Sequence, residues 1–443
     1  MHKLIFMSLC ALIFLLPVPL GSYRPWAIFA IGCYICFVFI LHCISCLIPN
    51  STHNYKLYPP RYSWPLLSIL MAVIFILCIQ LIPHTGVASI DPYQTTSMAL
   101  KTVFLLLFSW LVFCRCNTIK RIRLVIFTLI GSGVCQAIYA TYLNFSPNIN
   151  SLVFNSPYTQ RAVGSFTYPN FLANYLAMCL ALGIGVLISE LKIKNRQKTP
   201  IQLLRDLSRI MLSNKVALRL ALIIMIVGLI LTRSRMGNSA FFIALALVSF
   251  FSIFFYRQKP HYLRVLIISF FVLDFIIVGA LFGVEKVKDR LVETSLASET
   301  RDEVVRDSVT LILAKPWLGS GGGSFYTAFM PYQTQPYSGY YDNAHNDYIQ
   351  FSVELGIPMT LALGAFILFS LINCAYVMIK RKTGFYQGVA FGCAVAIIHM
   401  LLHSAVDYSL QAGANSFVFI LILTISYLAK HLPFEKSYKK QSA

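Results

Sequence analysis

Long apolar runs recur along the whole chain, and each is about as long as a helix that crosses a membrane. A bilayer core of about 30 Å needs about 20 apolar residues in helical form. The chain contains twelve such runs, near residues 4–20, 26–48, 64–82, 98–114, 122–143, 169–189, 216–232, 238–256, 262–284, 350–379, 386–405 and 413–430. The pattern predicts an all-α, polytopic integral membrane protein with about twelve transmembrane helices.

The first apolar run also has features of a secretory signal peptide. Lys3 precedes it, as a charged residue does in a signal peptide. No small-residue cleavage site follows the run, and Pro17 and Pro19 end it where such a site should lie. We therefore interpret this run as a span that stays in the protein.

Positive charges are distributed unevenly between the connections that join the runs. With a cytoplasmic N-terminus and alternating connections, 25 of the 36 Lys and Arg residues fall on the cytoplasmic side. Cytoplasmic loops of membrane proteins carry an excess of Lys and Arg. We expect both termini to be cytoplasmic, with the basic connection at 190–215 on the same side.

The composition agrees with a membrane protein and argues against a protein that binds nucleic acid. Hydrophobic residues make up 58% and charged residues 12%, with a net charge of +20; a soluble domain has about 25% charged residues. A basic surplus is also typical of nucleic-acid binding. Most of the basic residues lie in loops between spans, where a nucleic-acid-binding protein would not place them, so we expect the bilayer as partner and no nucleic acid.

The predicted spans divide the chain into four parts. Residues 1–143 hold spans one to five, and residues 144–284 hold spans six to nine with the basic loop. Residues 285–349 form a large loop on the outer side between helices nine and ten, and residues 350–443 hold spans ten to twelve with a cytoplasmic tail. We expect the chemistry on the outer side, because the polar residues that topology does not require gather there.

The large outer loop has two kinds of segment. Residues 298–317 have helical periodicity and predict an amphipathic helix along the membrane surface. Its expected apolar face consists of Val304, Val305, Val309, Ile312 and Leu313. A glycine-rich segment, GSGGGSF at 319–325, follows and can form a nest of amide groups for an anion. Six tyrosines then crowd the loop, and Tyr341 among them suits either an aromatic membrane belt or a platform for sugar rings.

Arginines on the outer side are candidates for binding phosphate. Arg161 is the only basic residue in the loop at 144–168, while Pro169 and Asn170 are ordinary residues for a helix start. Arg233 and Arg235 lie in the short connection between spans seven and eight. A guanidinium group fits phosphate with two hydrogen bonds. The alternative is that these side chains reach lipid headgroups. Arg301, in the amphipathic helix, is a further candidate, and its alternative is a charge on the solvated face of that helix.

The densest polar cluster is the sequence YYDNAHNDYIQFSVELG at 340–356. Asn346 or Asp347 can cap the tenth helix, which we expect to run unbroken over 350–379. His345 then lies at the outer headgroup level beside a helix N-terminus, which favours anions. A neutral histidine can serve as a general base. The alternative is a structural histidine at the interface.

Polar residues also occur within two predicted spans. His399, His403 and Asp407 have the spacing i, i+4, i+8 on the eleventh span and predict a polar seam. Asp407, at the outer end of this seam, is a candidate for orienting a group of the site. Asp274, in the middle of the ninth span, is an ionisable residue inside the membrane and so a functional candidate.

The order of these motifs resembles the O-antigen ligase and O-antigen polymerase superfamily, which includes protein O-oligosaccharyltransferases. The resemblance covers roughly residues 160–415 and rests on five segments. These are RAVGSFTYPNFLANYL, TRSRMG, KPWLGSGGGSF, AHNDYIQFSVELG and HSAVDYSLQAGAN. Ligases of this group often have His-Asn, nine residues and then Gly-x-x-Gly. His345, Asn346 and Gly356 fit that pattern, whereas Met359 replaces the second glycine.

The resemblance implies a bacterial inner-membrane glycosyltransferase that moves a glycan from undecaprenyl diphosphate to an acceptor on the periplasmic face. The acceptor is lipid A–core in ligases, Ser or Thr in oligosaccharyltransferases and another repeat unit in polymerases; we expect a ligase first. The enzyme is expected to invert the anomeric carbon and to need neither a metal nor a cofactor. His345 corresponds to the essential loop histidine. The substrate-binding residues are expected to be Arg161, Arg233, Arg235, Arg301, Tyr341, Asn346 and Asp407.

A twelve-span transporter is the alternative from another class of protein. The number of spans and the basic loop between two groups of six favour it. A transporter should have its polar residues near the middle of the membrane. Here they lie in an outer loop, and this distribution favours the enzyme.

Overall fold

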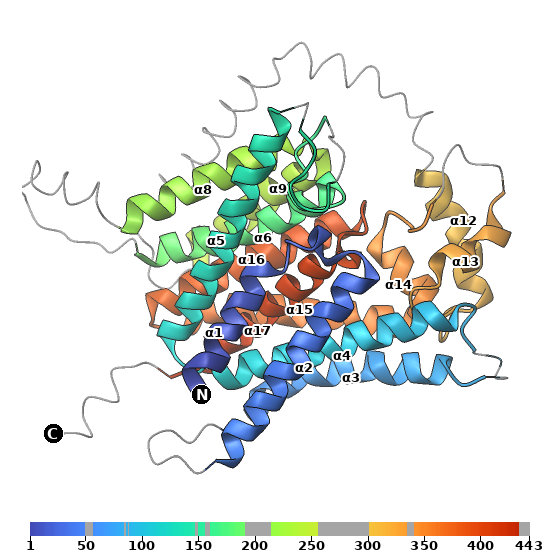
Figure 1. Ribbon diagram of the computed structural model, residues 1–443, viewed down its shortest axis with the longest axis horizontal. Coiled ribbons are helices and arrows are strands. Elements are labelled where there is room, and N and C mark those ends of the chain that lie inside the picture. Colours follow the sequence, from blue (N-terminus) through green and yellow to red (C-terminus); the bar gives the residue numbers. More distant parts are fainter. Residues whose placement is uncertain are drawn as a thin grey trace, which may run out of the picture.

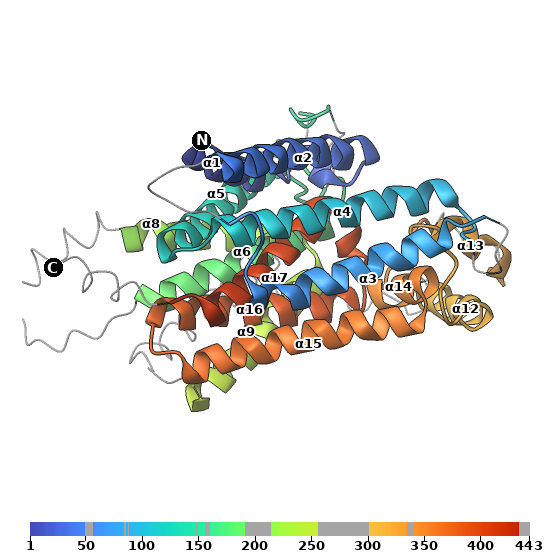
Figure 2. The ribbon, with the colours of Figure 1, turned by 90° about the horizontal axis from the view of Figure 1, so that it is seen from below.

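The protein is a bundle of helices whose long members run roughly side by side (Figures 1 and 2). The computed structural model describes residues 1–48, 56–83, 86, 88–146, 149–155, 160–190, 214–255, 301–334 and 341–433. Within these ranges the regular elements are all helices, with no strand. The expected all-α fold is confirmed.

Nine helices of the described part are long and apolar enough to cross a membrane. They are α2 (Pro25–Leu47), α3 (Trp64–Gln80, with the turn before it), α4 (Pro92–Arg115), α5 (Ile119–Asn144), α6 (Pro169–Glu190), α9 (Arg235–Phe255), α15 (Ile357–Lys380), α16 (Gly384–Ser404) and α17 (Gly413–His431). Two shorter apolar helices are α1 (His2–Leu15) and α8 (Asn214–Leu231). These eleven helices account for eleven of the predicted runs. The run near 262–284, with Asp274, lies outside the described residues, as does most of the basic loop at 190–215.

The predicted helix over 350–379 is in fact two helices, so the expectation of one unbroken span was wrong. Helix α14 (Asp347–Leu355) ends at Gly356, whose φ is +81°, and α15 begins with the next residue. A Cβ atom at position 356 would lie 2.3 Å from the carbonyl oxygen of Trp317. Glycine is needed there both for the left-handed backbone and for the close approach.

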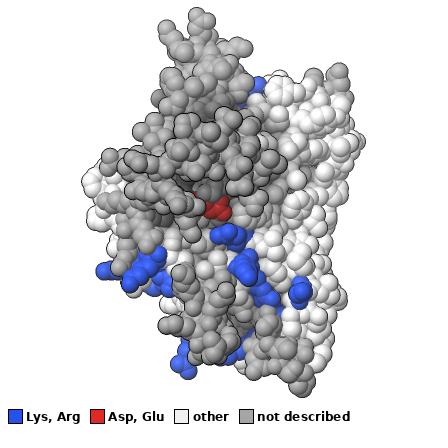
Figure 3. Space-filling model, turned by 90° about the vertical axis from the view of Figure 1, so that its left-hand side faces the viewer, with Lys and Arg blue, Asp and Glu red and all other residues white. Residues whose placement is uncertain are grey.

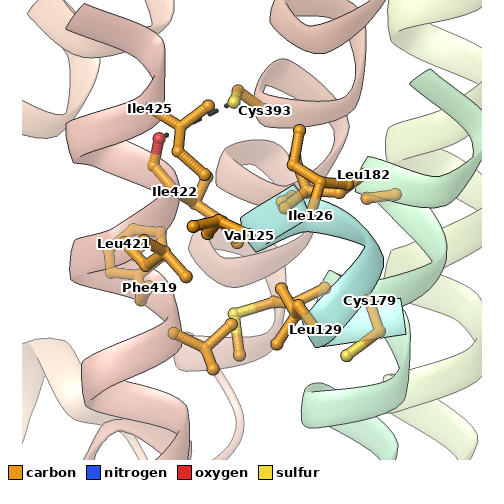
Figure 4. Close-up of a cluster of buried hydrophobic side chains, with 14 of the residues drawn as sticks. Val125, Ile126, Leu129, Cys179, Leu182, Cys393, Phe419, Leu421, Ile422 and Ile425 are labelled. Carbon is orange, nitrogen blue, oxygen red and sulfur yellow. Dashed lines mark hydrogen bonds between the residues drawn. The ribbon is translucent and has the colours of Figure 1, made fainter. Parts of the chain in front are cut away.

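The centre of the bundle is α6, which is buried along its length and packs most extensively on α16. Glycines allow this close packing: a Cβ at Gly388 would lie 2.3 Å from the carbonyl oxygen of Gly185. Small residues of this kind let membrane helices approach closely. Apolar side chains of α5, α6, α16 and α17 fill the space beside this contact, as Figure 4 shows.

The outer helices present large apolar side chains away from the bundle. Phe37 of α2, Phe75 of α3 and Ile372 of α15 are each more than half exposed. An apolar surface of this extent is costly in water and favourable against lipid tails. Together with the nine long helices, it identifies a multi-pass membrane protein.

Basic side chains gather at one end of the bundle (Figure 3). This end includes the start of α5, with Lys120 and Arg123, and the end of α15, with Lys380 (Figure 2). Arg123 forms an ion pair of 3.8 Å with Glu190 at the end of α6. The charge pattern predicted that the connections before α5 and after α15 lie on one side of the membrane. The structure brings these two connections to the same end of the bundle.

Three short helices lie at the opposite end of the bundle (Figures 1 and 2). They are α12 (Arg301–Ala314), α13 (Phe325–Phe329) and α14. Helix α12 confirms the helix expected in the outer loop, but its predicted apolar face is divided. Val304 and Ile312 are buried against α13 and α14, whereas Val309 and Leu313 are 44% and 68% exposed. Leu311, outside the predicted face, is buried instead.

Candidate active site

His345 lies in a strained turn directly before α14. Its φ is +50°, in the left-handed region that residues with a side chain rarely adopt. Such a conformation costs about 1–3 kcal/mol and persists only where the surroundings enforce it. The neighbouring residues do so: the amide of Ala344 donates to Gln350 Oε1 at 2.8 Å. Strained residues of this kind occur at functional sites, and the catalytic role of His345 stays a prediction.

Asn346 holds this turn in place by capping α14. Its Oδ1 accepts from the amides of Tyr348 (3.0 Å) and Ile349 (3.2 Å), which confirms the expected cap. Its Nδ2 donates to the carbonyl oxygen of Ala405 at 2.8 Å. The amide group is thus used by the fold, and a direct contact of Asn346 with substrate stays a prediction.

Aromatic side chains surround the ring of His345. Tyr408 meets it edge-on with 4.7 Å between centroids, and Tyr341 does so at 5.8 Å. Tyr168 stacks on Tyr408 with 6.1 Å between their ring centroids. The structure therefore brings His345 and Tyr341 together and adds Tyr408, which the sequence pattern did not single out.

A hydrogen-bonded chain links the His345 loop to Arg161. The amide of Asp347 donates to the carbonyl oxygen of Asp407 at 3.2 Å. Asn170 Nδ2 donates to Asp407 Oδ2 at 2.5 Å, and an Arg161 guanidinium nitrogen donates to Asn170 Oδ1 at 3.0 Å. Asn170 thus connects two predicted site residues. Sequence reasoning missed this role, because an Asn beside Pro169 is ordinary at a helix start.

The same chain extends to the turn between α8 and α9. Arg161 Nε donates to the carbonyl oxygen of Thr232 at 2.8 Å. Arg233 follows in this turn with a φ of +50°, and Arg235 is the exposed first residue of α9. Three of the four predicted arginines therefore lie on adjoining segments. The fourth, Arg301, begins α12, which packs on α14, but its side chain lies outside the described part.

Asp407 is not on the helix that was expected to carry it. Helix α16 ends at Ser404, so the expected i, i+4, i+8 stripe stops before Asp407, which lies in the following turn. His403 Nε2 still approaches Asp407 Oδ2 at 3.9 Å, and the rings of His399 and His403 stack at 5.5 Å. His399 Nε2 lies 2.7 Å from Asn174 Oδ1 on α6. The polar seam is therefore present, with its outer end in a turn.

Amides of the glycine-rich segment bond to groups of the protein itself, and those of Gly323 and Phe325 hydrogen-bond the carboxyl group of Glu354. The amide of Ser320 donates to the carbonyl oxygen of Val353 at 2.8 Å, and the amide of Gly322 donates to Gln80 Oε1 at 3.1 Å. These two amides attach the segment to α14 and α3, and binding of a substrate anion by the segment stays a prediction. For metals, no three His, Cys, Asp or Glu side chains of the described ranges group closely enough to hold an ion.

Two carboxylic acids on α14, Asp347 and Glu354, are buried, which the sequence analysis did not predict. Asp347 Oδ2 accepts from Ser404 Oγ at 2.9 Å, and Glu354 Oε1 accepts from Gln350 Nε2 at 2.7 Å. Burial raises the pKa of Asp347 to about 8 and that of Glu354 to about 7. Their spacing of seven residues puts both on one face of α14, a signal that the sequence does contain.

The buried acid predicts a pH dependence of stability. Because the folded-state pKa of Asp347 lies above its ordinary value of 3.8, the native state holds more protons than the unfolded state between these pH values. Its contribution to the free energy of unfolding therefore falls as pH rises from about 4 to about 8. Asp347→Asn should show a smaller drop in melting temperature between pH 5 and 8 than the wild type. Asp342→Asn, which changes an exposed carboxyl group, should keep the wild-type drop, and equal drops in all three proteins would contradict the prediction.

Comparison with known proteins supports the family that the motifs resemble. Residues 220–364, about a third of the chain, match the family model Wzy_C, described as O-Antigen ligase. The matched range includes Arg233, Arg235, Arg301 and His345, whereas Arg161 and Asp407 lie outside it. A search of curated proteins found no match. This domain match and the all-α membrane fold support the resemblance of the chain to the O-antigen ligase-like superfamily of membrane glycosyltransferases.

Proposed function

We propose that the protein transfers a glycan from undecaprenyl diphosphate to an acceptor hydroxyl on the periplasmic side of the bacterial inner membrane. The observation that carries this proposal is the continuous chain of contacts from Arg161 through Asn170 and Asp407 to the loop of His345. This chain joins candidate phosphate-binding arginines to a candidate base. Transfer of a glycosyl group from a diphosphate is helped by cations that stabilise the leaving diphosphate and by a base that takes the proton of the acceptor hydroxyl.

The arginines are proposed to hold the diphosphate of the donor. Arg233 and Arg235 lie at the N-terminus of α9, where the helix dipole also favours an anion. Arg161 holds this turn against α6 through its bonds to Thr232 and Asn170. Cations in this position stabilise the negative charge that develops on the leaving diphosphate.

His345 is proposed to act as the general base. Its ring would accept the proton of the acceptor hydroxyl while the hydroxyl oxygen attacks the anomeric carbon of the donor. The carbon–oxygen bond to the diphosphate breaks, and its electron pair leaves with undecaprenyl diphosphate. Attack from the face opposite the leaving group inverts the anomeric carbon.

The acceptor proposed first is lipid A–core, which makes the protein an O-antigen ligase. The spacing of His345, Asn346 and Gly356 supports this branch, and Gly356 forms the sharp break between α14 and α15. Met359, at the position of the second glycine, is buried against α3 with Leu77. A serine or threonine of a protein and a growing glycan remain the acceptors of the alternative proposals.

A matched pair of arginine variants tests the proposed donor site. Arg235→Ala removes a guanidinium group whose charged hydrogen bond contributes about 1.5–3 kcal/mol. We expect transfer from purified undecaprenyl-diphosphate glycan to lipid A–core in proteoliposomes to fall about 10- to 100-fold. Arg219→Ala is the control, because Arg219 is an exposed arginine near the other end of the same α8–α9 hairpin. Equal losses in both variants would count against the donor site.

A further inference from the structure

Helix α12 presents an apolar stripe that the described part of the protein does not cover. Val309 and Leu313, one turn apart on this helix, are both exposed, and Trp317, in the turn that follows the helix, is 75% exposed. Residues four apart lie on the same side of a helix. The opposite side of α12 carries Val304, which is buried in one apolar cluster with residues of α13 and α14. Packing within the outer loop therefore leaves this stripe, Val309, Leu313 and Trp317, without a neighbour.

The turn that carries Trp317 is fixed to the start of a membrane-crossing helix. The amide of Ile357, the first residue of α15, donates to the carbonyl oxygen of Pro316 at 2.8 Å. The carbonyl oxygen of Trp317 lies so close to Gly356 that no Cβ fits there. Tryptophan is enriched where membrane helices enter the bilayer, because its ring is apolar and its N–H group is polar. Trp317 is thus held at the level where α15 begins to cross the membrane.

The stripe adjoins the apolar surface that α15 presents to lipid. Ile357 and Leu361, in the first two turns of α15, are exposed, and the exposed apolar surface continues along the helix to Leu368 and Ile372. Figure 2 shows α12 at this end of α15. Contact of so large an apolar surface with water is unfavourable, whereas contact with acyl chains is not. The stripe and the surface of α15 therefore suit the same neighbour, the lipid bilayer.

A basic side chain follows the stripe at the other end of the helix. Arg306 lies one turn before Val309, and its side chain is 73% exposed. The stem of an arginine can cover apolar surface while its charged group stays among polar headgroups. Apolar and aromatic side chains together with a basic one on the exposed side are typical of a helix that lies in the membrane interface.

We propose that α12 lies in the lipid interface at this end of the bundle, with Val309, Leu313 and Trp317 against acyl chains and Arg306 among the headgroups. The helix is then an attachment of the outer loop to the membrane in addition to α15. Because α12 and α14 share an apolar cluster and His345 directly precedes α14, this attachment also fixes the depth of the His345 turn. The lipid contact does not rest on the proposed function, and its test needs no glycan transfer.

Quenching of tryptophan fluorescence tests the contact in the full-length protein in liposomes. The emission of Trp317 is the difference between the wild type and Trp317→Phe, which keeps an aromatic ring. We expect lipids brominated near the headgroup end of their acyl chains to reduce this emission more than lipids brominated near the methyl end, because an interfacial helix enters the boundary by only about 5–10 Å. Trp26 is the matched reference, because it is 48% exposed in the first turn of α2, a second membrane-crossing helix that begins beside the His345 loop. Loss of Trp317 emission with aqueous iodide and not with brominated lipids would overturn the proposal.

A second probe tests whether the whole helix lies in the interface or only its end. Val309→Trp in the Trp317→Phe protein reports from the other end of the stripe, and the exposed position accepts the larger side chain. We expect brominated lipids to quench this emission about as strongly as that of Trp317. Quenching by iodide alone would show that α12 projects into water. Quenching by neither agent would show that protein, such as a second copy of the chain, covers the stripe, and either result would contradict the lipid contact.

Discussion

His345→Asn should lower glycan transfer at least about 100-fold, because a positioned general base contributes about 10²- to 10⁴-fold to such a reaction. Asparagine is the most suitable replacement here. It adopts the left-handed backbone more readily than most residues, so the turn at φ +50° is kept. The side chain of asparagine cannot accept the proton of an attacking hydroxyl at neutral pH. The measurement is the rate of transfer to lipid A–core in proteoliposomes at saturating donor, where weaker donor binding does not contribute to the loss.

The control for this prediction is His431→Asn. His431 stacks on Tyr62 at 4.6 Å at the end of α17, far along the bundle from the His345 loop. This variant should retain wild-type transfer. Crosslinking of the donor to His345→Asn should also stay near the wild-type level, because the arginines that bind the diphosphate are unchanged. If His345→Asn transfers glycan at the wild-type rate, His345 is not the base.

Gly388→Leu should abolish or greatly reduce the yield of folded protein. The first atom of any side chain at this position would lie 2.3 Å from the carbonyl oxygen of Gly185 and 2.7 Å from Ser189 Cβ. The contacts involve backbone of the central helix α6, which cannot move without disturbing α5 and α17 as well. Overpacking in a core costs about 1–3 kcal/mol for added methylenes, and a collision with backbone costs more.

The matched control is Gly384→Leu on the same helix. A Cβ at Gly384 approaches only the carbonyl oxygen of Ser189, at the ordinary contact distance of 3.9 Å. We expect its yield and melting temperature in detergent, measured by size-exclusion chromatography and thermal scanning, to match the wild type. Equal yields for the two variants would show that α6 and α16 do not pack as closely as described.

The membrane helices could be predicted from the sequence because burial in lipid requires only long apolar runs. The break at Gly356 was missed, although a glycine commonly ends a helix and Pro358, two residues later, suits the start of the next one. Its necessity comes from Trp317, 39 positions earlier in the chain, whose carbonyl oxygen leaves no space for a Cβ. The prediction of which face of α12 is buried was wrong because that face also depends on a contact with a distant residue. Asp307 is buried because it accepts from Thr334, and this contact depends on where the loop folds back.

In the candidate site, too, the residues could be predicted where the local sequence was sufficient and not where contacts with distant segments were needed. His345, Asn346 and the arginines could be chosen as candidates because membrane insertion does not require polar residues at these positions. Asn170 could not be identified as a connecting residue, since its partner Asp407 is 237 positions away. The turn after α16 could not be predicted either, because the spacing of His399, His403 and Asp407 is that of a continuing helix. Contacts between distant segments decide these roles.

The attachment of the His345 loop to the turn at 405–411 has a consequence for chimeric proteins. The loop contacts this turn and the end of α16 through Asn346, Asp347 and Tyr348. The outer loop is therefore not a transplantable unit. A loop from a relative that is grafted onto this bundle should work only when residues 405–411 are exchanged with it. Among such proteins, we therefore expect a change of acceptor preference to need changes in both segments.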